Sequence, residues 1–120
     1  MIGPMPRAWR LVPRIRIVQG EKIAFGPGKA DLLEAILRMG KIRDAAQSLD
    51  MSYMRAWKLI RTMNGAFRQP VVEATRGGSD RGGAAVTEFG RHILELYRAI
   101  EKKAAGGAGA EWSEMKRLLR

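Results

Sequence analysis

Residues 51 to 72 contain basic and hydroxyl side chains but no acidic residue. If this stretch is helical, at about 100° per residue its polar side chains fall on one arc, apart from the apolar ones. The candidate contact residues are Ser52, Arg55, Lys58, Arg61 and Thr62. A solvated helix normally mixes charge signs, so a wholly basic exposed face indicates contact with phosphates and base edges. The alternative is that this face serves only solubility.

The opposite arc of the same segment is apolar and indicates a helix anchored on a core. Ser52 is a suitable N-cap for it. The apolar positions recur at successive turns, at Tyr53, Ala56, Trp57, Ile60, Met63 and Phe67. We therefore expect Tyr53 and Trp57 to pack in the core rather than stack on bases.

The segments on either side predict how this helix is presented. Before it, residues 42–49 place apolar side chains, including two small alanines, at helical spacing, and Asp50 stands where a tight turn is needed. After it, residues 71–74 and 84–86 read as two strands joined by the glycine-rich loop RGGSDRGG. Arg76 and Arg81 in this loop either reach a DNA minor groove or backbone, or keep the loop soluble. The order of these elements is that of a winged helix-turn-helix.

The remaining segments complete a fold that is mainly α with small β-hairpins. Residues 14–25 predict a hairpin that turns near Gly20, and residues 29–39 predict a helix that ends at Gly40. Thr87 is expected to cap a further helix that ends in the glycine-rich residues 106–110. Its expected core face is Phe89, Ile93, Leu96, Tyr97 and Ile100. The predicted divisions are an irregular basic segment at 1–13, the winged helix-turn-helix domain at 14–105, and a Gly/Ala linker with a short amphipathic helix at 106–120.

Composition narrows the classes of partner. The formal net charge is +10, a field that attracts polyanions such as nucleic acid. No apolar run approaches the roughly 18 residues that span a bilayer, so no membrane partner is expected. The chain has no cysteine and a single histidine, His92, so we expect no metal, no cofactor and no enzymatic activity, and a cytoplasmic location.

Two further segments bear on assembly. Trp112, Met115 and Leu119 align on one side of a tail too short to form its own core, which favours a homodimer that reads an inverted repeat. The N-terminal arginines fit a DNA-contacting arm, a dimer surface or simple solvation equally well. They are Arg7, Arg10, Arg14 and Arg16.

Four strings together resemble the N-terminal DNA-binding domain of molybdate-responsive (ModE-type) transcriptional regulators, which is related to that of LysR-type regulators. They are GPGKADLLEAI (26–36), AAQSLDMSYMRAWKLI (45–60), GGSDRGGAAVTEFG (77–90) and LYRAIE (96–101). The order of MSYxRAW, a glycine-rich wing and VTxxG is the more specific feature, and the resemblance covers about Arg14 to Lys103.

The chain also departs from that family. Lys41 stands where members usually carry serine, Asp50 where they carry glycine, and the wing contains Ser79, Asp80 and Arg81 in place of nearly pure glycine. An aspartate tolerates the left-handed backbone that a glycine would adopt, so the turn is expected to survive. Full-length members carry C-terminal oxyanion-binding domains with no counterpart in these 120 residues, so we do not expect this chain to bind molybdate.

The resulting hypothesis is a transcriptional regulator that binds double-stranded DNA in a sequence-specific way. In it, Arg55 and Lys58 lie near base edges, and Ser52, Arg61 and Thr62 lie nearer phosphates. The alternative is a winged-helix interaction module whose basic face binds an acidic protein. A steep salt dependence together with a preference among duplex sequences separates the two.

Overall fold

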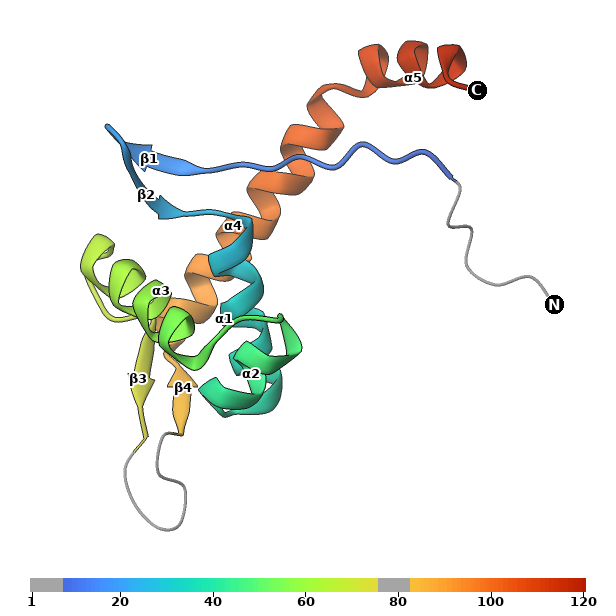
Figure 1. The fold of residues 1–120 in the computed structure, drawn as a ribbon. Helices are drawn as coiled ribbons and strands as arrows, with labels where there is room; N and C mark the ends of the chain where they lie inside the picture. Colours follow the sequence, from blue (N-terminus) through green and yellow to red (C-terminus); the bar gives the residue numbers. More distant parts are fainter. Residues whose placement is uncertain (1–7, 76–82) are drawn as a thin grey trace, which may run out of the picture.

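The computed structural model describes residues 8–75 and 83–120 and shows a winged helix-turn-helix, as predicted. Figure 1 shows two small hairpins set among the helices, with the wing strands at one end of the molecule and the last helix at the other. The elements within the described residues are β1 (Ile17–Gln19), β2 (Lys22–Phe25), α1 (Pro27–Met39), α2 (Ile42–Ser48), α3 (Tyr53–Ala66), β3 (Val72–Ala74), β4 (Ala84–Val86), α4 (Glu88–Gly107) and α5 (Gly109–Leu118).

The first hairpin forms where the sequence predicted it, although its first strand begins at Ile17 rather than near Arg14. Val18 pairs with Ile23 and the chain reverses through Gly20, whose φ of 61° favours glycine. At the end of β2, Phe25 is fully buried. Its ring makes an edge-to-face contact with the ring of Tyr97, which anchors the hairpin to α4.

The helix-turn-helix is defined by two left-handed residues. Gly40 ends α1 with a φ of 75°, and its backbone N–H donates to the carbonyl of Ile36. Asp50 has a φ of 55° between α2 and α3, the only non-glycine residue with positive φ in the described part of the chain. A short polar side chain tolerates this conformation, so the turn is made with aspartate as predicted.

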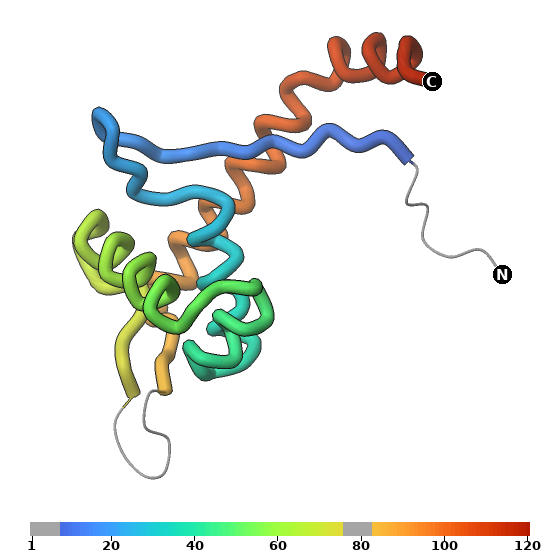
Figure 2. The backbone as a smooth tube through the Cα atoms, in the orientation of Figure 1, coloured from blue at the N-terminus to red at the C-terminus, as the bar shows by residue number. Residues whose placement is uncertain are grey.

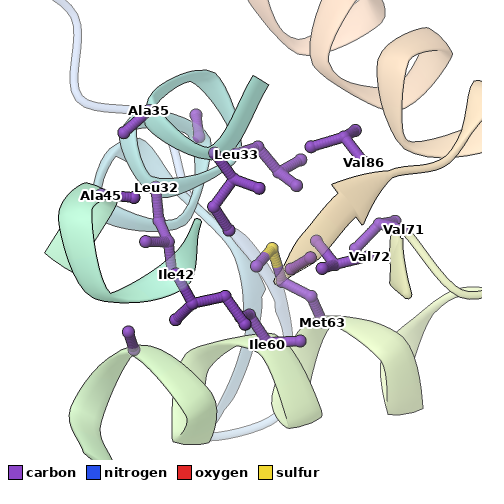
Figure 3. Packing of buried hydrophobic residues seen from close by; sticks show 14 of the residues in the cluster. Leu32, Leu33, Ala35, Ile42, Ala45, Ile60, Met63, Val71, Val72 and Val86 are labelled. Carbon is purple, nitrogen blue, oxygen red and sulfur yellow. The ribbon is translucent and has the colours of Figure 1, made fainter. Parts of the chain in front are cut away.

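The core lies where the helix-turn-helix and the wing meet. Figure 3 shows side chains from α1, α2, α3 and both wing strands converging on one apolar cluster. Its labelled members are Leu32, Leu33, Ala35, Ile42, Ala45, Ile60, Met63, Val71, Val72 and Val86. The alanines of α2 are buried to 1% exposure or less, so the neighbouring helices approach closely, as their size predicts.

Two elements differ from the prediction at the C-terminal side. Leu96 and Ile100 were expected in the core, but their side chains are 48% and 46% exposed. Of the other predicted positions, Tyr97 is buried, and Phe89 and Ile93 are half-buried against the core. Gly90 and Leu94 are also buried, although they were not predicted to be. The buried face of α4 is thus turned towards Gly90, where an added Cβ would lie 2.2 Å from the carbonyl oxygen of Val71. The helix packs closely against the start of the wing at this residue.

The second difference is that α4 continues through Gly106 and Gly107, and α5 follows after a break at Ala108. Figure 2 shows the N-terminal segment crossing α4. The hydroxyl of Tyr97 donates to the carbonyl oxygen of Ile15 at 2.6 Å, and the indole N–H of Trp9 donates to the carbonyl oxygen of Arg120 at 3.2 Å. The segment before β1 therefore packs on α4 and reaches the end of the chain.

Candidate nucleic-acid interface

The helix α3 presents its polar side chains from a firmly anchored backbone. Its first turn is capped by Ser52, whose hydroxyl oxygen accepts a hydrogen bond from the backbone N–H of Arg55 at 3.0 Å. On the opposite face Ala56, Ile60 and Met63 are buried to 1% exposure or less. The orientation of α3 is therefore fixed by the core, and the same arc always faces solvent.

The exposed arc of α3 contains the basic residues that the sequence identified. Arg55, Lys58 and Arg61 are all exposed. Thr62 is half-buried, and its hydroxyl donates to the backbone carbonyl of Lys58 at 3.0 Å. In this rotamer the Thr62 oxygen can accept a hydrogen bond from a ligand, but its proton is already used within the helix.

The residues along one flank of this arc were either expected in the core or not predicted as contacts. Tyr53 was expected in the core, but it is 37% exposed, and the guanidinium of Arg43 lies 5.5 Å from its ring centroid. Trp57 is half-buried against the core and makes an edge-to-face contact with Tyr53. The side chain of Met54 is 79% exposed. On a helical wheel Tyr53 lies within the apolar arc and Trp57 lies at its margin, so periodicity gave no signal that Tyr53, the first residue of α3, is exposed.

On the other flank of the arc, Arg55 lines a hollow of about 320 Å³ that lies between α3, α1 and the segment before β1. Arg14 and Arg16 also line this hollow. Arg10 lies elsewhere, in a second hollow beside the far half of α4, and Arg7 is outside the described residues. The N-terminal arginines in the described part of the chain therefore divide between two surfaces.

The base of the wing is attached directly to α3. The side-chain oxygen of Asn64 accepts from the backbone N–H groups of Val71 and Val72 at 2.8 and 3.3 Å, and its NH₂ group donates to the carbonyl of Val72 at 3.0 Å. No pattern in the sequence marked Asn64 for this role. Arg76 and Arg81, the two predicted wing contacts, are outside the described residues.

Over residues 8–75 and 83–120, no three acidic or histidine side chains gather as metal ligands would. In the same residues, no helix has both the length and the apolar character that crossing a membrane requires.

Comparison with known proteins confirms the resemblance inferred from the sequence. No protein-family model matches the chain. It is 38% identical over 94 residues to the molybdenum transport protein ModE of Azotobacter vinelandii, covering 78% of this chain and 35% of the relative. It is 42% identical over 76 residues to the molybdenum-pterin-binding protein MopA of Rhodobacter capsulatus, covering 63% of this chain and 29% of the relative.

A third relative is named for the activity that the sequence suggested. The DNA-binding transcriptional dual regulator ModE of Escherichia coli K12 is 34% identical over 87 residues, covering 70% of this chain and 33% of the relative. The chain thus spans about a third of the length of the relatives it matches.

Proposed function

We propose that this chain, a winged helix-turn-helix of the ModE type, binds double-stranded DNA in a sequence-specific way and regulates transcription. The observation that carries the proposal is the exposed arc of α3, which holds Arg55, Lys58 and Arg61 with no acidic residue from Met51 to Val72. The rigid attachment of α3 to the core supports it, since a recognition helix must keep its orientation in the major groove. The net charge of +10 supplies the long-range attraction.

Each contact residue has a proposed role. Lys58, near the centre of the exposed arc, and Arg55 lie near base edges. Ser52 keeps its hydroxyl proton free to donate to a phosphate, because its oxygen is the acceptor in the helix cap. Arg61 lies nearer a phosphate. Thr62, whose proton is used within the helix, contacts DNA as an acceptor.

The wing contributes a second contact. We assign Arg76 and Arg81 to the minor groove or the backbone beside the groove that α3 enters. The hydrogen bonds of Asn64 to Val71 and Val72 support this assignment, because they fix the base of the wing relative to α3.

The active form in this proposal is a cytoplasmic homodimer. Large apolar side chains remain exposed on the N-terminal segment, α4 and the C-terminal tail, away from α3. They are Trp9, Leu11, Val12, Leu96, Ile100, Met115, Leu118 and Leu119. Exposed large apolar side chains gathered on these elements indicate an interface. A second copy is the occupant we propose, because a twofold axis lets two winged helices read an inverted repeat.

The test is a titration of duplex DNA at several salt concentrations, with duplexes selected from a random pool. Contact with about five to eight phosphates gives a log–log slope of about −4 to −7, and the selected duplexes contain an inverted repeat. A flat slope, or equal affinity for selected and scrambled duplexes, contradicts the proposal. Salt-sensitive binding to an acidic protein with none to DNA indicates an interaction module instead.

A further inference from the structure

The hollow beside Arg55 is lined by cations from three separate parts of the chain. Arg14 and Arg16 precede β1, Lys29 belongs to the first turns of α1, and Arg55 to the first turn of α3. The other lining residues are Ile23, Gly26, Pro27, Gly28, Met51 and Leu59. None of the lining residues in the described part of the chain is acidic. The fold therefore concentrates positive charge in one concave place.

Lys29 is the most buried of these cations. Its side chain is 8% exposed, and its ammonium group donates to the carbonyl oxygen of Ile23 at 2.6 Å. Burial, and to a lesser degree the charge of Lys22, lower the pKa of Lys29. An anion that enters the hollow that Lys29 lines would favour its charged form.

Arg16 is held over the entrance of α1. A Cβ added at Gly26 would lie 3.4 Å from the Cγ of Arg16, so the arginine stem packs against this glycine. Among the described residues, none of Arg14, Arg16, Lys29 and Arg55 forms an ion pair. Arg14, Arg16 and Arg55 are exposed, so their guanidinium groups are available to an external anion, whereas the ammonium of Lys29 already donates to Ile23.

The position of the hollow identifies the anion. Arg55 lies on both the hollow and the basic arc of α3, so a strand that follows the groove around α3 passes this place. We infer that the hollow binds one phosphate of the DNA backbone, at the flank of α3 opposite Tyr53 and Arg43. This inference rests on the proposed function: it adds Arg14, Arg16 and Lys29 to the DNA contacts, and the five N–H donors of Arg55 let it contact the phosphate as well as a base edge.

Gly28 provides a test that leaves all four cations in place. It is an exposed residue in the first turn of α1, and a Cβ added there meets no atom within 4 Å. Gly28→Asp places a carboxylate at the edge of the hollow, where a helix N-terminus favours negative charge, so the fold is retained. Gly28→Ala is the matched control, since it adds the Cβ without the charge.

We expect Gly28→Asp to lower duplex affinity by about tenfold and to make the salt slope less steep by about 1, as for the loss of one phosphate contact. Gly28→Ala, which adds the Cβ without the charge, should change the affinity and the salt slope much less than Gly28→Asp does. Thermal unfolding checks that both variants are folded. If Gly28→Asp binds the selected duplex with parental affinity and slope, the inference is wrong while the proposed function stands. If the parent does not bind duplex DNA, both fail.

Replacing single phosphates of the selected duplex by neutral methylphosphonates identifies the contact. One position in each half-site should weaken binding of the parent and of Gly28→Ala but have little effect on Gly28→Asp. General charge repulsion would weaken binding without this dependence on one position, and that result overturns the inference. So does saturable binding of inorganic phosphate by the parent that Gly28→Asp abolishes without changing DNA affinity, because the hollow would then be a site for a free anion.

Discussion

Asn64 and Val72 are joined by two hydrogen bonds that run in opposite directions, one from the Val72 N–H to the side-chain oxygen and one from the side-chain NH₂ to the Val72 carbonyl. The same oxygen also accepts from the N–H of Val71. Asn64 lies in α3 and Val72 begins β3. The side chain of Asn64 thus connects the backbone at the start of the wing to the proposed recognition helix.

Asn64→Ala should lower the free energy of unfolding by about 1 to 3 kcal/mol, because it leaves the N–H of buried Val71 without its partner. Urea unfolding measures the change. Arg68→Ala, at an exposed position just beyond α3, is the control and should stay within about 0.5 kcal/mol of the parent. Equal stability of Asn64→Ala and the parent would show that the wing does not depend on this side chain.

Lys58→Ala and Arg55→Ala should each cost about 1 to 3 kcal/mol of specific DNA binding and leave the melting temperature unchanged. The reason is that both side chains are exposed on α3. Competition binding with single-base variants of the selected duplex measures the affinity and the specificity. A variant that binds like the parent would remove its residue from the interface.

Trp57→Ala should lower the free energy of unfolding more than Tyr53→Ala, because Trp57 packs on the core and Tyr53 lies at the surface of α3. Trp57 is half-buried against the core, so we expect a loss of about 1.5 to 3 kcal/mol, below the range for a fully buried tryptophan. Tyr53→Ala, at the more exposed position, should lower the free energy of unfolding by less than about 1 kcal/mol. Chemical denaturation measures both changes. A larger loss for Tyr53→Ala than for Trp57→Ala would contradict the assignment of the core-facing side of α3.

Gly90→Ala should destabilise the fold by several kcal/mol. The new Cβ would lie 2.2 Å from the Val71 carbonyl oxygen and 2.8 Å from a methyl carbon of Val86, so α4 would have to move away from the wing. In Gly65→Ala the added Cβ meets no atom within 4 Å. This control should gain about 0.5 to 1 kcal/mol from helix propensity. Thermal denaturation tests both, and a fully stable Gly90→Ala would contradict the close packing of α4.

Leu96→Glu should convert the proposed dimer to a monomer without unfolding it, because this side chain is 48% exposed in a single chain. Light scattering gives the mass, and affinity for the inverted repeat should fall because the two half-sites are no longer linked. Glu95→Ala, at an exposed neighbouring position, is the control.

A chain that ends at Lys103 tests the tail separately. If it remains an equally tight dimer with unchanged operator affinity, α5 has no part in assembly. An intact chain that is a monomer both free and on DNA rules out the twofold arrangement.

The sequence by itself determined the features that depend on neighbouring residues. The caps at Ser52 and Thr87, the stop at Gly40 and the left-handed Asp50 were all predicted and found. Each depends on hydrogen bonds or backbone sterics within a few residues, which the local sequence specifies. The basic arc of α3 was predicted for the same reason, since helical periodicity fixes which side chains share a face.

Tertiary structure decided the features that join distant segments. The exposure of Leu96 and Ile100 follows from the close packing of Gly90 on Val71, and the position of the N-terminal segment from the hydrogen bond between Tyr97 and Ile15, 82 residues apart.

The grouping of Arg16, Lys29 and Arg55 around one hollow depends likewise on how three segments pack. Periodicity identifies the faces of an element, but the partner that covers each face is chosen by shape, burial and hydrogen bonding across the whole fold.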